Sequence, residues 1–137
     1  MYINDYLEEK NFYIRRLLVE INGEIKNDVK HNVNINVSFG IAQPIFTKED
    51  RYNMVVFPFL IEIDSPEVQI SFEFIMGFHI KTSILSDVEF KKMINENGDE
   101  FTKRVNKTIN KIVSNALKYS NIKFANELFV DRIYYPI

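Results

Sequence analysis

Apolar residues recur at every second position in four segments of the chain, which is the pattern of β-strands with one buried face. In the clearest segment, from Val33 to Ile41, odd-numbered apolar residues alternate with asparagine, serine and glycine. In the run from Ile70 to Ile80, the even positions carry only isoleucine, phenylalanine and methionine. We therefore predict strands over residues 12–21, 33–41, 55–63 and 70–80.

Two of the predicted strands carry irregularities. Between Phe12 and Ile21 the alternation shifts at Arg15 and Arg16, which predicts a β-bulge. The segment from Val55 to Ile63 is apolar on both faces and contains Pro58, which cannot donate a ladder hydrogen bond. We therefore expect the segment from Val55 to Ile63 to lie at a sheet edge or to carry a bulge.

Turn-forming residues separate the predicted strands. Asn22-Gly23 follows the first strand, and the motif from Asp64 to Glu67 contains serine and proline. The stretch from Gln43 to Asn53 is polar after Pro44 and predicts a loop. These signals predict hairpins that join four consecutive antiparallel strands.

The apolar period changes from two to about 3.6 after Leu85, which predicts helices. The motif from Ser86 to Glu89 has the form of a capping box, and the short helix that it starts is expected to end near Asn97-Gly98. A longer helix is predicted over residues 100–119. Its apolar stripe consists of Phe101, Val105, Ile109, Ile112, Val113, Ala116 and Leu117. Residues 124–137 show no clear period and are assigned to no element.

These elements define the expected fold class, which is α+β. A single domain over residues 1–137 would contain a four-stranded antiparallel sheet, followed by a short and a long helix packed on it. The long helix should cover the sheet face that carries Phe72, Phe74, Met76 and Phe78, because this face is the most apolar surface of the sheet.

The composition excludes several classes of protein and of functional site. The chain is 46% hydrophobic and 26% charged, has no cysteine, and carries no apolar run near the ~18 residues that span a bilayer. The acidic N-terminal segment does not resemble a secretory signal, so a cytoplasmic protein without membrane insertion is expected. His31 and His79 lack a metal-ligand spacing, and no phosphate-binding loop occurs. We therefore expect no enzyme, no metal and no cofactor.

Basic residues gather on the long helix, although the chain as a whole has a net charge of −2. Between Asp99 and Phe124 there are six basic and two acidic residues. Such a face can contact phosphates or an acidic partner, but neither an aromatic stacking set nor a DNA-binding motif accompanies it. Nucleic acid is therefore not the expected partner, and a solvated helix face is the simpler interpretation.

The order of the elements from Phe12 to Asn121 resembles the SecB-like export chaperones and their shorter relatives. The local likeness lies in ISFEFIMGFHI, followed by SDVEFKKMINENGDEFTKRVNKTINKIVSNAL. Gly77 and Phe78 match the end of the family's fourth strand, and Phe101 matches the aromatic step into its long helix. The proline and tyrosine that follow this aromatic in the family are replaced here by Thr102 and Lys103.

The resemblance implies a non-enzymatic, chaperone-like protein that holds apolar extended segments of an unfolded client or of a dedicated protein partner. The expected contacts with a client or partner are Val55, Phe57, Phe59, Ile61, Phe78, Phe129 and Tyr134. The alternative function is that of a nucleic-acid-binding or regulatory factor that uses the basic face of the long helix.

A homo-oligomer, either a dimer or a tetramer, is also expected. The segment from Met54 to Ile63 presents apolar residues on both sides, and two helices on one sheet face can cover only one of them. A second copy of the chain would cover the other side. The competing solution is that the C-terminal segment folds back and supplies the cover within one chain.

Overall fold

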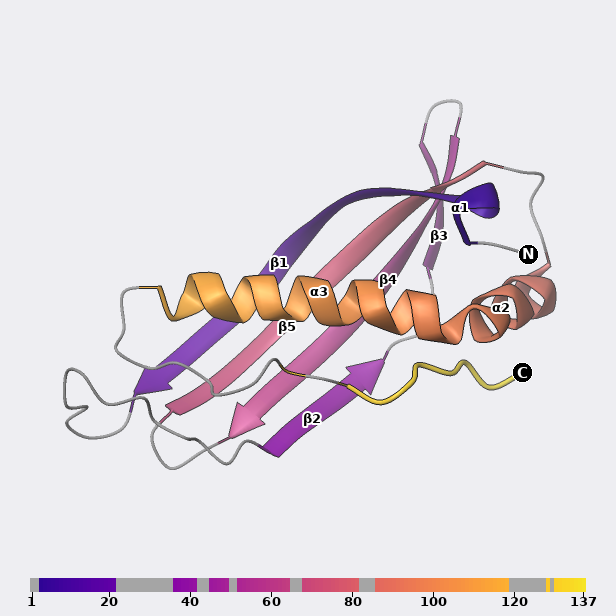
Figure 1. Cartoon of the computed structure of the whole chain (residues 1–137). Helices are drawn as coiled ribbons and strands as arrows, with labels where there is room; N and C mark the ends of the chain where they lie inside the picture. The colour runs from indigo at the N-terminus through magenta and orange to yellow at the C-terminus, as the bar shows by residue number, and fades with distance from the viewer. Residues whose placement is uncertain are drawn as a thin grey trace.

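The computed structural model describes residues 3–21, 36–41, 45–49, 52–64, 68–81, 86–118, 128 and 130–137. Its elements, in chain order, are α1 (Ile3–Tyr6), β1 (Leu7–Ile21), β2 (Asn36–Ile41), β3 (Ile45–Glu49), β4 (Tyr52–Asp64), β5 (Val68–Ile80), α2 (Asp87–Glu96) and α3 (Gly98–Ala116). The strands form one antiparallel sheet, and α3 crosses one face of it (Figure 1). The predicted α+β class, with helices packed on an antiparallel sheet, is confirmed.

The strand order in the sheet is β1-β5-β4-β2, and β3 pairs separately with β4. β1 runs antiparallel to β5 from Leu7, opposite Ile80, to Ile21, opposite Val68. The register between them shifts twice, and one shift lies between Ile14 and Arg16. The bulge predicted at the two arginines is therefore confirmed.

The first predicted hairpin is wrong. β1 pairs with β5 rather than with β2, so the chain from Ile21 to Asn36 leads to the opposite edge of the sheet. The Asn22-Gly23 motif itself lies outside the described residues. The physical reason is that β1 and β5 match each other over nearly their whole length, with 15 and 13 residues, whereas the described part of β2 has six.

The predicted loop over residues 43–53 contains a strand that the sequence pattern did not indicate. β3 pairs with the first part of β4, with Ile45 opposite Val56 and Glu49 opposite Tyr52. Only its first two residues are large and apolar, so a period of two is not visible in so short a segment. The sheet therefore has five strands instead of four.

Pro58 lies inside the sheet, because β4 has β5 on one side and β2 and β3 on the other. The expected edge position of this strand is therefore wrong. β2 pairs with residues 59–64 of β4, and β3 pairs with residues 52–56. Pro58 falls between these two registers, where the ladder on that side is interrupted and a missing N–H donor is tolerated.

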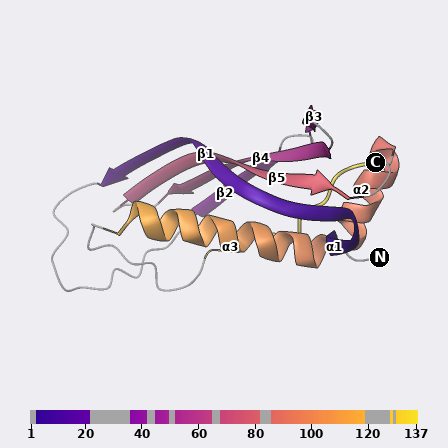
Figure 2. The ribbon, with the colours of Figure 1, turned by 90° about the horizontal axis from the view of Figure 1, so that it is seen from above.

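The core lies between the sheet and α3. Phe72, Phe74 and Phe78 of β5 are fully buried, as predicted for the face under the long helix. The Phe101 ring of α3 lies 4.9 Å from the Phe57 ring and 6.2 Å from the Phe78 ring, measured between centroids. Figure 2 shows α3 on one side of the sheet, whereas no described helix covers the other side.

The two helices begin and end close to the predicted positions. α2 follows Ser86, whose hydroxyl oxygen accepts a hydrogen bond of 3.2 Å from the Glu89 amide. The apolar stripe of α3 is buried, apart from Ala116, which is half-buried, and Lys103 lies on the exposed side. The capping serine and the amphipathic pattern predicted from the sequence are confirmed.

The Ser86 cap gives a first testable prediction. Ser86→Ala should lower the free energy of unfolding by about 1 kcal/mol, because the Glu89 amide would lose its acceptor. Urea denaturation followed by circular dichroism measures this change. Ser114→Ala is the matched control, because Ser114 is exposed in the interior of α3. Equal stability of the two variants would show that Ser86 does not cap α2.

Candidate functional site

The structure separates the residues that were predicted to contact a client. Val55, Phe57, Phe59, Ile61 and Phe78 lie together on the helix-covered face, and each is at most 2% exposed. Tyr134 is 61% exposed in the C-terminal segment, and Phe129 lies outside the described residues. The five core residues are thus inaccessible while the helix covers them, and their contact with a client stays a prediction.

Exposed apolar side chains lie instead along β1. They are Tyr13, Ile14, Leu17, Leu18 and Ile21, with exposed fractions between 43% and 56%. We call this group the β1 apolar edge, because β1 is the first strand of the sheet order. An edge strand has backbone N–H and C=O groups on its outer side that can pair with another extended chain.

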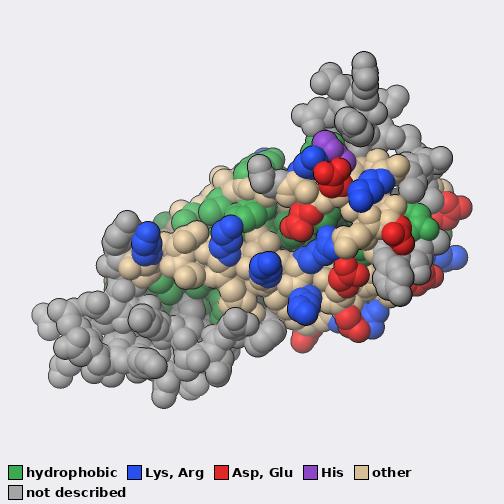
Figure 3. Space-filling view, turned by 45° about the horizontal axis from the view of Figure 1, so that its top comes forward, with side chains coloured by type: hydrophobic (Ala, Val, Ile, Leu, Met, Phe, Trp, Pro, Cys, Tyr) green, Lys and Arg blue, Asp and Glu red, His purple; other side chains and the backbone are tan. Residues whose placement is uncertain are grey.

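The register shows which way these side chains point. Ile14 and Leu17 lie opposite the buried Phe74 and Phe72, on the helix side of the sheet. Tyr13 lies opposite Ile75, on the other side. The β1 apolar edge therefore presents apolar groups to both sides of the sheet. Figure 3 shows apolar side chains beside the row of lysines on α3.

The uncovered face of the sheet continues this apolar surface. Ile75 lies between Tyr13 of β1 and Pro58 of β4 in the sheet register. Leu60 of β4, on the same face, is 37% exposed, and Val56 is half-buried. The described residues therefore cover the second apolar side of β4 only in part, because Leu60 is exposed and Val56 half-buried, whereas the neighbouring Ile75 is 6% exposed.

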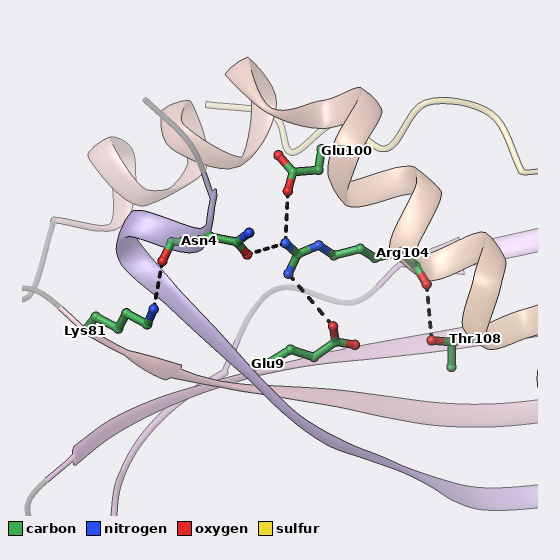
Figure 4. Close-up of polar contacts among 6 residues, drawn as sticks. All are labelled: Asn4, Glu9, Lys81, Glu100, Arg104 and Thr108. Atoms are coloured by element: carbon green, nitrogen blue, oxygen red, sulfur yellow. Dashed lines mark hydrogen bonds and ion pairs between the residues drawn. The ribbon is translucent and has the colours of Figure 1, made fainter.

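A polar cluster around Arg104 holds the beginning of β1 against α3 (Figure 4). The Arg104 guanidinium donates hydrogen bonds to the Asn4 side chain and to Glu100, the latter at 2.9 Å, and lies 3.8 Å from a Glu9 oxygen. Lys81 Nζ donates to the Asn4 carbonyl at 2.9 Å. These contacts join α1 and the start of β1 to α3 and to the end of β5.

The C-terminal segment, residues 128 and 130–137, folds back onto the helices. Its residues Ile133 and Tyr135 are buried, and the Tyr135 ring lies 6.1 Å from the Phe57 ring. It therefore adds cover on the helix side of the sheet. The competing expectation that this segment folds back is met, but the segment does not reach the opposite side of β4.

Polar side chains of α2 and α3 form hydrogen bonds with the backbone of this segment. We call this row of helix residues, which consists of asparagines and one threonine, the amide row. Its members and the residues that they bond are Asn95 with Tyr135, Thr102 with Ile133, Asn106 with Val130, and Asn110 with Leu128. All of these hydrogen bonds measure 2.8 to 2.9 Å. The helix side chains therefore pair with backbone N–H and C=O groups of the C-terminal segment that a neighbouring strand would bind in a sheet.

Arg132 and Tyr135 of this segment differ in how their polar groups are paired. Arg132 donates to the Asn95 carbonyl at 2.9 Å and lies 3.6 Å from Asp99, in the space that a side chain at Gly98 would occupy. The Tyr135 hydroxyl is buried and has no hydrogen-bond partner among the described residues. Burial raises the pKa of this phenol above its usual value, because the phenolate would lose its hydration.

The sequence contained a signal for this row that our sequence analysis missed. Thr102, Asn106 and Asn110 are spaced by four residues, so they follow one side of a helix. Polar residues of this kind compete for backbone hydrogen bonds and are uncommon as a regular row inside a helix. Because residues 124–137 were assigned to no element, they could have been predicted to bind along this row.

The basic face of α3 is partly engaged. Arg104 is bound to acidic groups, and Lys111 Nζ lies 5.7 Å from the centroid of the Phe12 ring. Lys103 and Lys107 line a cavity of about 660 Å³, together with Arg132 and members of the amide row. The cavity lies beside the C-terminal segment, because Arg132 of that segment is part of its lining. We call the surface along the amide row, on which the C-terminal segment lies, the groove.

The described ranges also bear on metal sites and membrane spans. Those residues contain no group of three or more His, Asp or Glu side chains that could hold a metal ion. His79 lies on β5 and is half-buried, whereas His31 lies outside the described part of the chain. Among the described helices, none is long and apolar enough to cross a membrane.

The described elements form a two-layer arrangement, with the long helix α3 on one face of an antiparallel sheet. The chain is similar to the solved Mycobacterium tuberculosis SecB-like chaperone in complex with a peptide from an antitoxin, with 8% sequence identity and a TM-score of 0.52. This match covers 96% of the present chain and 90% of that one. The SecB-like fold predicted from the sequence is thereby confirmed.

A second solved structure is also similar. It is a protein of unknown function from Streptococcus agalactiae, with 13% identity and a TM-score of 0.47, over 90% of the present chain and 97% of that one. No family model matches the chain, and no curated protein matches its sequence. The similarity to the mycobacterial chaperone is therefore one of fold.

Proposed function

We propose that the protein is a non-enzymatic, chaperone-like binding protein that holds extended apolar segments of a client or of one dedicated protein partner. The observation that carries the proposal is the β1 apolar edge. It combines five large apolar side chains, at least 43% exposed, with an edge strand of 15 residues. An extended segment can pair with the backbone of this strand and place its own apolar side chains against both sides.

The physical basis is general. Exposed apolar surface of this extent on a folded domain marks interaction sites, and burial of such surface drives association. Backbone pairing at a strand edge accepts many sequences, because it uses groups that every residue carries. The SecB-like fold supports the proposal, since the similar mycobacterial chaperone was solved with a bound peptide.

The proposal is tested with a fluorescein-labelled unfolded client, such as a reduced and carboxymethylated protein, whose anisotropy is followed as the full chain is added. We expect saturable binding that persists between about 50 mM and 500 mM salt, because apolar contacts are not weakened by screening. Absence of binding at micromolar protein concentration would contradict the proposed function.

We also propose that the chain forms a homo-oligomer, at least a dimer. Leu60 and Val56 of β4 lie on the sheet face that no described helix covers, and a second copy would bury them by self-complementary contact while the β1 apolar edge stays available to a client. Sedimentation equilibrium should give a mass above the 16.2 kDa of one chain at micromolar concentration. A mass near 16.2 kDa over the whole concentration range would contradict this proposal.

The alternative function, a nucleic-acid-binding or regulatory factor, makes the opposite prediction for salt. Binding through Lys103, Lys107 and Lys111 would weaken steeply as salt rises, because it depends on release of counterions from phosphates. Arg104 is already paired with Glu100 and Glu9, which leaves less positive charge on the helix for phosphates. Titration of a labelled single-stranded oligonucleotide under the same conditions distinguishes the two functions.

A further inference from the structure

The amide row recognises the C-terminal segment by its main chain. The Asn110 side chain donates to the Leu128 carbonyl at 2.9 Å and accepts from the Leu128 amide at 2.8 Å. Asn95 makes the same pair of contacts with Tyr135, both at 2.8 Å. Two-point contacts of this kind reproduce the pairing of neighbouring β-strands, and they make no demand on the identity of the bound residue.

Apolar side chains of the segment supply the remaining contacts. Leu128, Ile133 and Tyr135 are at most 5% exposed, whereas Val130 is half-buried. Asp131, Arg132 and Tyr134 point away from the core and are exposed. The groove therefore selects an extended chain with apolar residues at the first, third, sixth and eighth positions, and it accepts polar residues between them.

The resident segment does not fit its groove perfectly. The Tyr135 hydroxyl is buried and finds no hydrogen-bond partner within the described part of the chain, and an unsatisfied buried hydroxyl opposes docking of the residue that carries it. The Arg132 contact with Asp99 is more than half exposed and adds little to the binding. A chain with an apolar side chain in place of the phenol would avoid this cost.

We propose that the groove along the amide row is a second binding site for extended polypeptide, which the C-terminal segment occupies in the resting protein and which a client with the same apolar spacing takes over. The inference rests on the proposed function, polypeptide binding, but it concerns a surface separate from the β1 apolar edge. Its apparent affinity is set by the fraction of molecules in which the resident segment has left the groove.

The probe is a fluorescein-labelled peptide with the sequence FANELFVDRIYYPI of residues 124–137. It is titrated with the full chain and with three variants, and binding is read from anisotropy. Ile133→Asp places a charge in the core and releases the resident segment. Tyr135→Phe removes the unpaired hydroxyl and holds the segment more firmly. Ile133→Asp combined with Asn110→Ala damages the groove in the released protein.

Opposite changes are expected from the two single variants. Ile133→Asp should bind the probe at least about tenfold more tightly than the unaltered chain, because its groove is open. Tyr135→Phe should bind it about threefold to tenfold more weakly, because its resident segment competes better. Adding Asn110→Ala to Ile133→Asp should remove most of the gain, since two backbone contacts of the probe are lost.

Several outcomes would overturn the inference. One is equal probe affinity of the unaltered chain and Tyr135→Phe, a comparison that stays valid even if Ile133→Asp does not fold. Another is tight probe binding that Asn110→Ala leaves unchanged in the released protein. A third outcome is that the unaltered chain has a doubled mass and the Ile133→Asp variant does not. This result would show that the groove takes the C-terminal segment of a second copy instead of a client.

Failure of this inference is distinguishable from failure of the proposed function. A variant with Leu17→Lys and Leu18→Lys alters the β1 apolar edge and leaves the amide row intact. It should still bind the probe with the affinity of the unaltered chain. Loss of probe binding in this variant would place the peptide on β1 and would overturn the assignment of the groove.

Discussion

Replacing Phe101 by alanine should lower the free energy of unfolding by about 3–5 kcal/mol, the largest effect on stability that we expect from a single substitution in α3. The Phe101 side chain is fully buried, and its ring lies within 6.4 Å of the Phe57, Phe59 and Phe78 rings. Its removal leaves a cavity between the helix and both central strands. Urea denaturation followed by circular dichroism measures the loss.

Lys103→Ala is the matched control for this prediction. Lys103 lies two residues further along α3 on the exposed side, and its truncation should change stability by no more than about 0.5 kcal/mol. A loss below about 1 kcal/mol for Phe101→Ala would show that α3 does not close the core through this ring.

The double variant with Leu17→Lys and Leu18→Lys should weaken binding of the unfolded client at least tenfold. Leu17 and Leu18 are 43% and 47% exposed and point to opposite sides of the sheet. Two lysines there would oppose burial of the strand against any apolar segment, and loss of two leucine contacts corresponds to roughly 2–4 kcal/mol of binding free energy. Anisotropy of the labelled client measures the change.

Glu20→Lys is the control for this substitution, because it adds positive charge at an exposed polar position of the same strand. It should leave client binding within about twofold of the unaltered chain. The thermal midpoint and the mass of each variant are measured in parallel. If the double variant folds and binds the client as the unaltered chain does, the client does not bind at the β1 apolar edge.

Much of the fold could be predicted because its signals are local. The alternation in β5 and the stripe in α3 each specify a buried face, and Ser86 marks a helix start through its own hydrogen bond. The partner of β1 could not be predicted in this way, because strand pairing depends on contacts between distant segments. β3 was missed because its five residues are too few for a period to emerge.

The candidate site was harder to predict for a different reason. Apolar patterning shows that Val55, Phe57 and Ile61 need cover, but it does not show whether a helix or a partner provides it. The structure places all three in the core. Leu17 and Leu18, by contrast, belong to the strand whose alternation the bulge disturbs, so the sequence did not show that they would stay exposed.

The pairing of the first strand with the last has a consequence for synthesis of the protein. The paired residues are between 47 and 73 positions apart, from Ile21 with Val68 to Leu7 with Ile80. At about 5–20 residues per second, a ribosome needs roughly 2 to 15 s to supply the second partner after the first. During that interval the nascent chain carries β1 without its β5 partner. An extended apolar segment is the class of ligand proposed for the finished protein, so the proposed site would also accept the protein's own nascent chains.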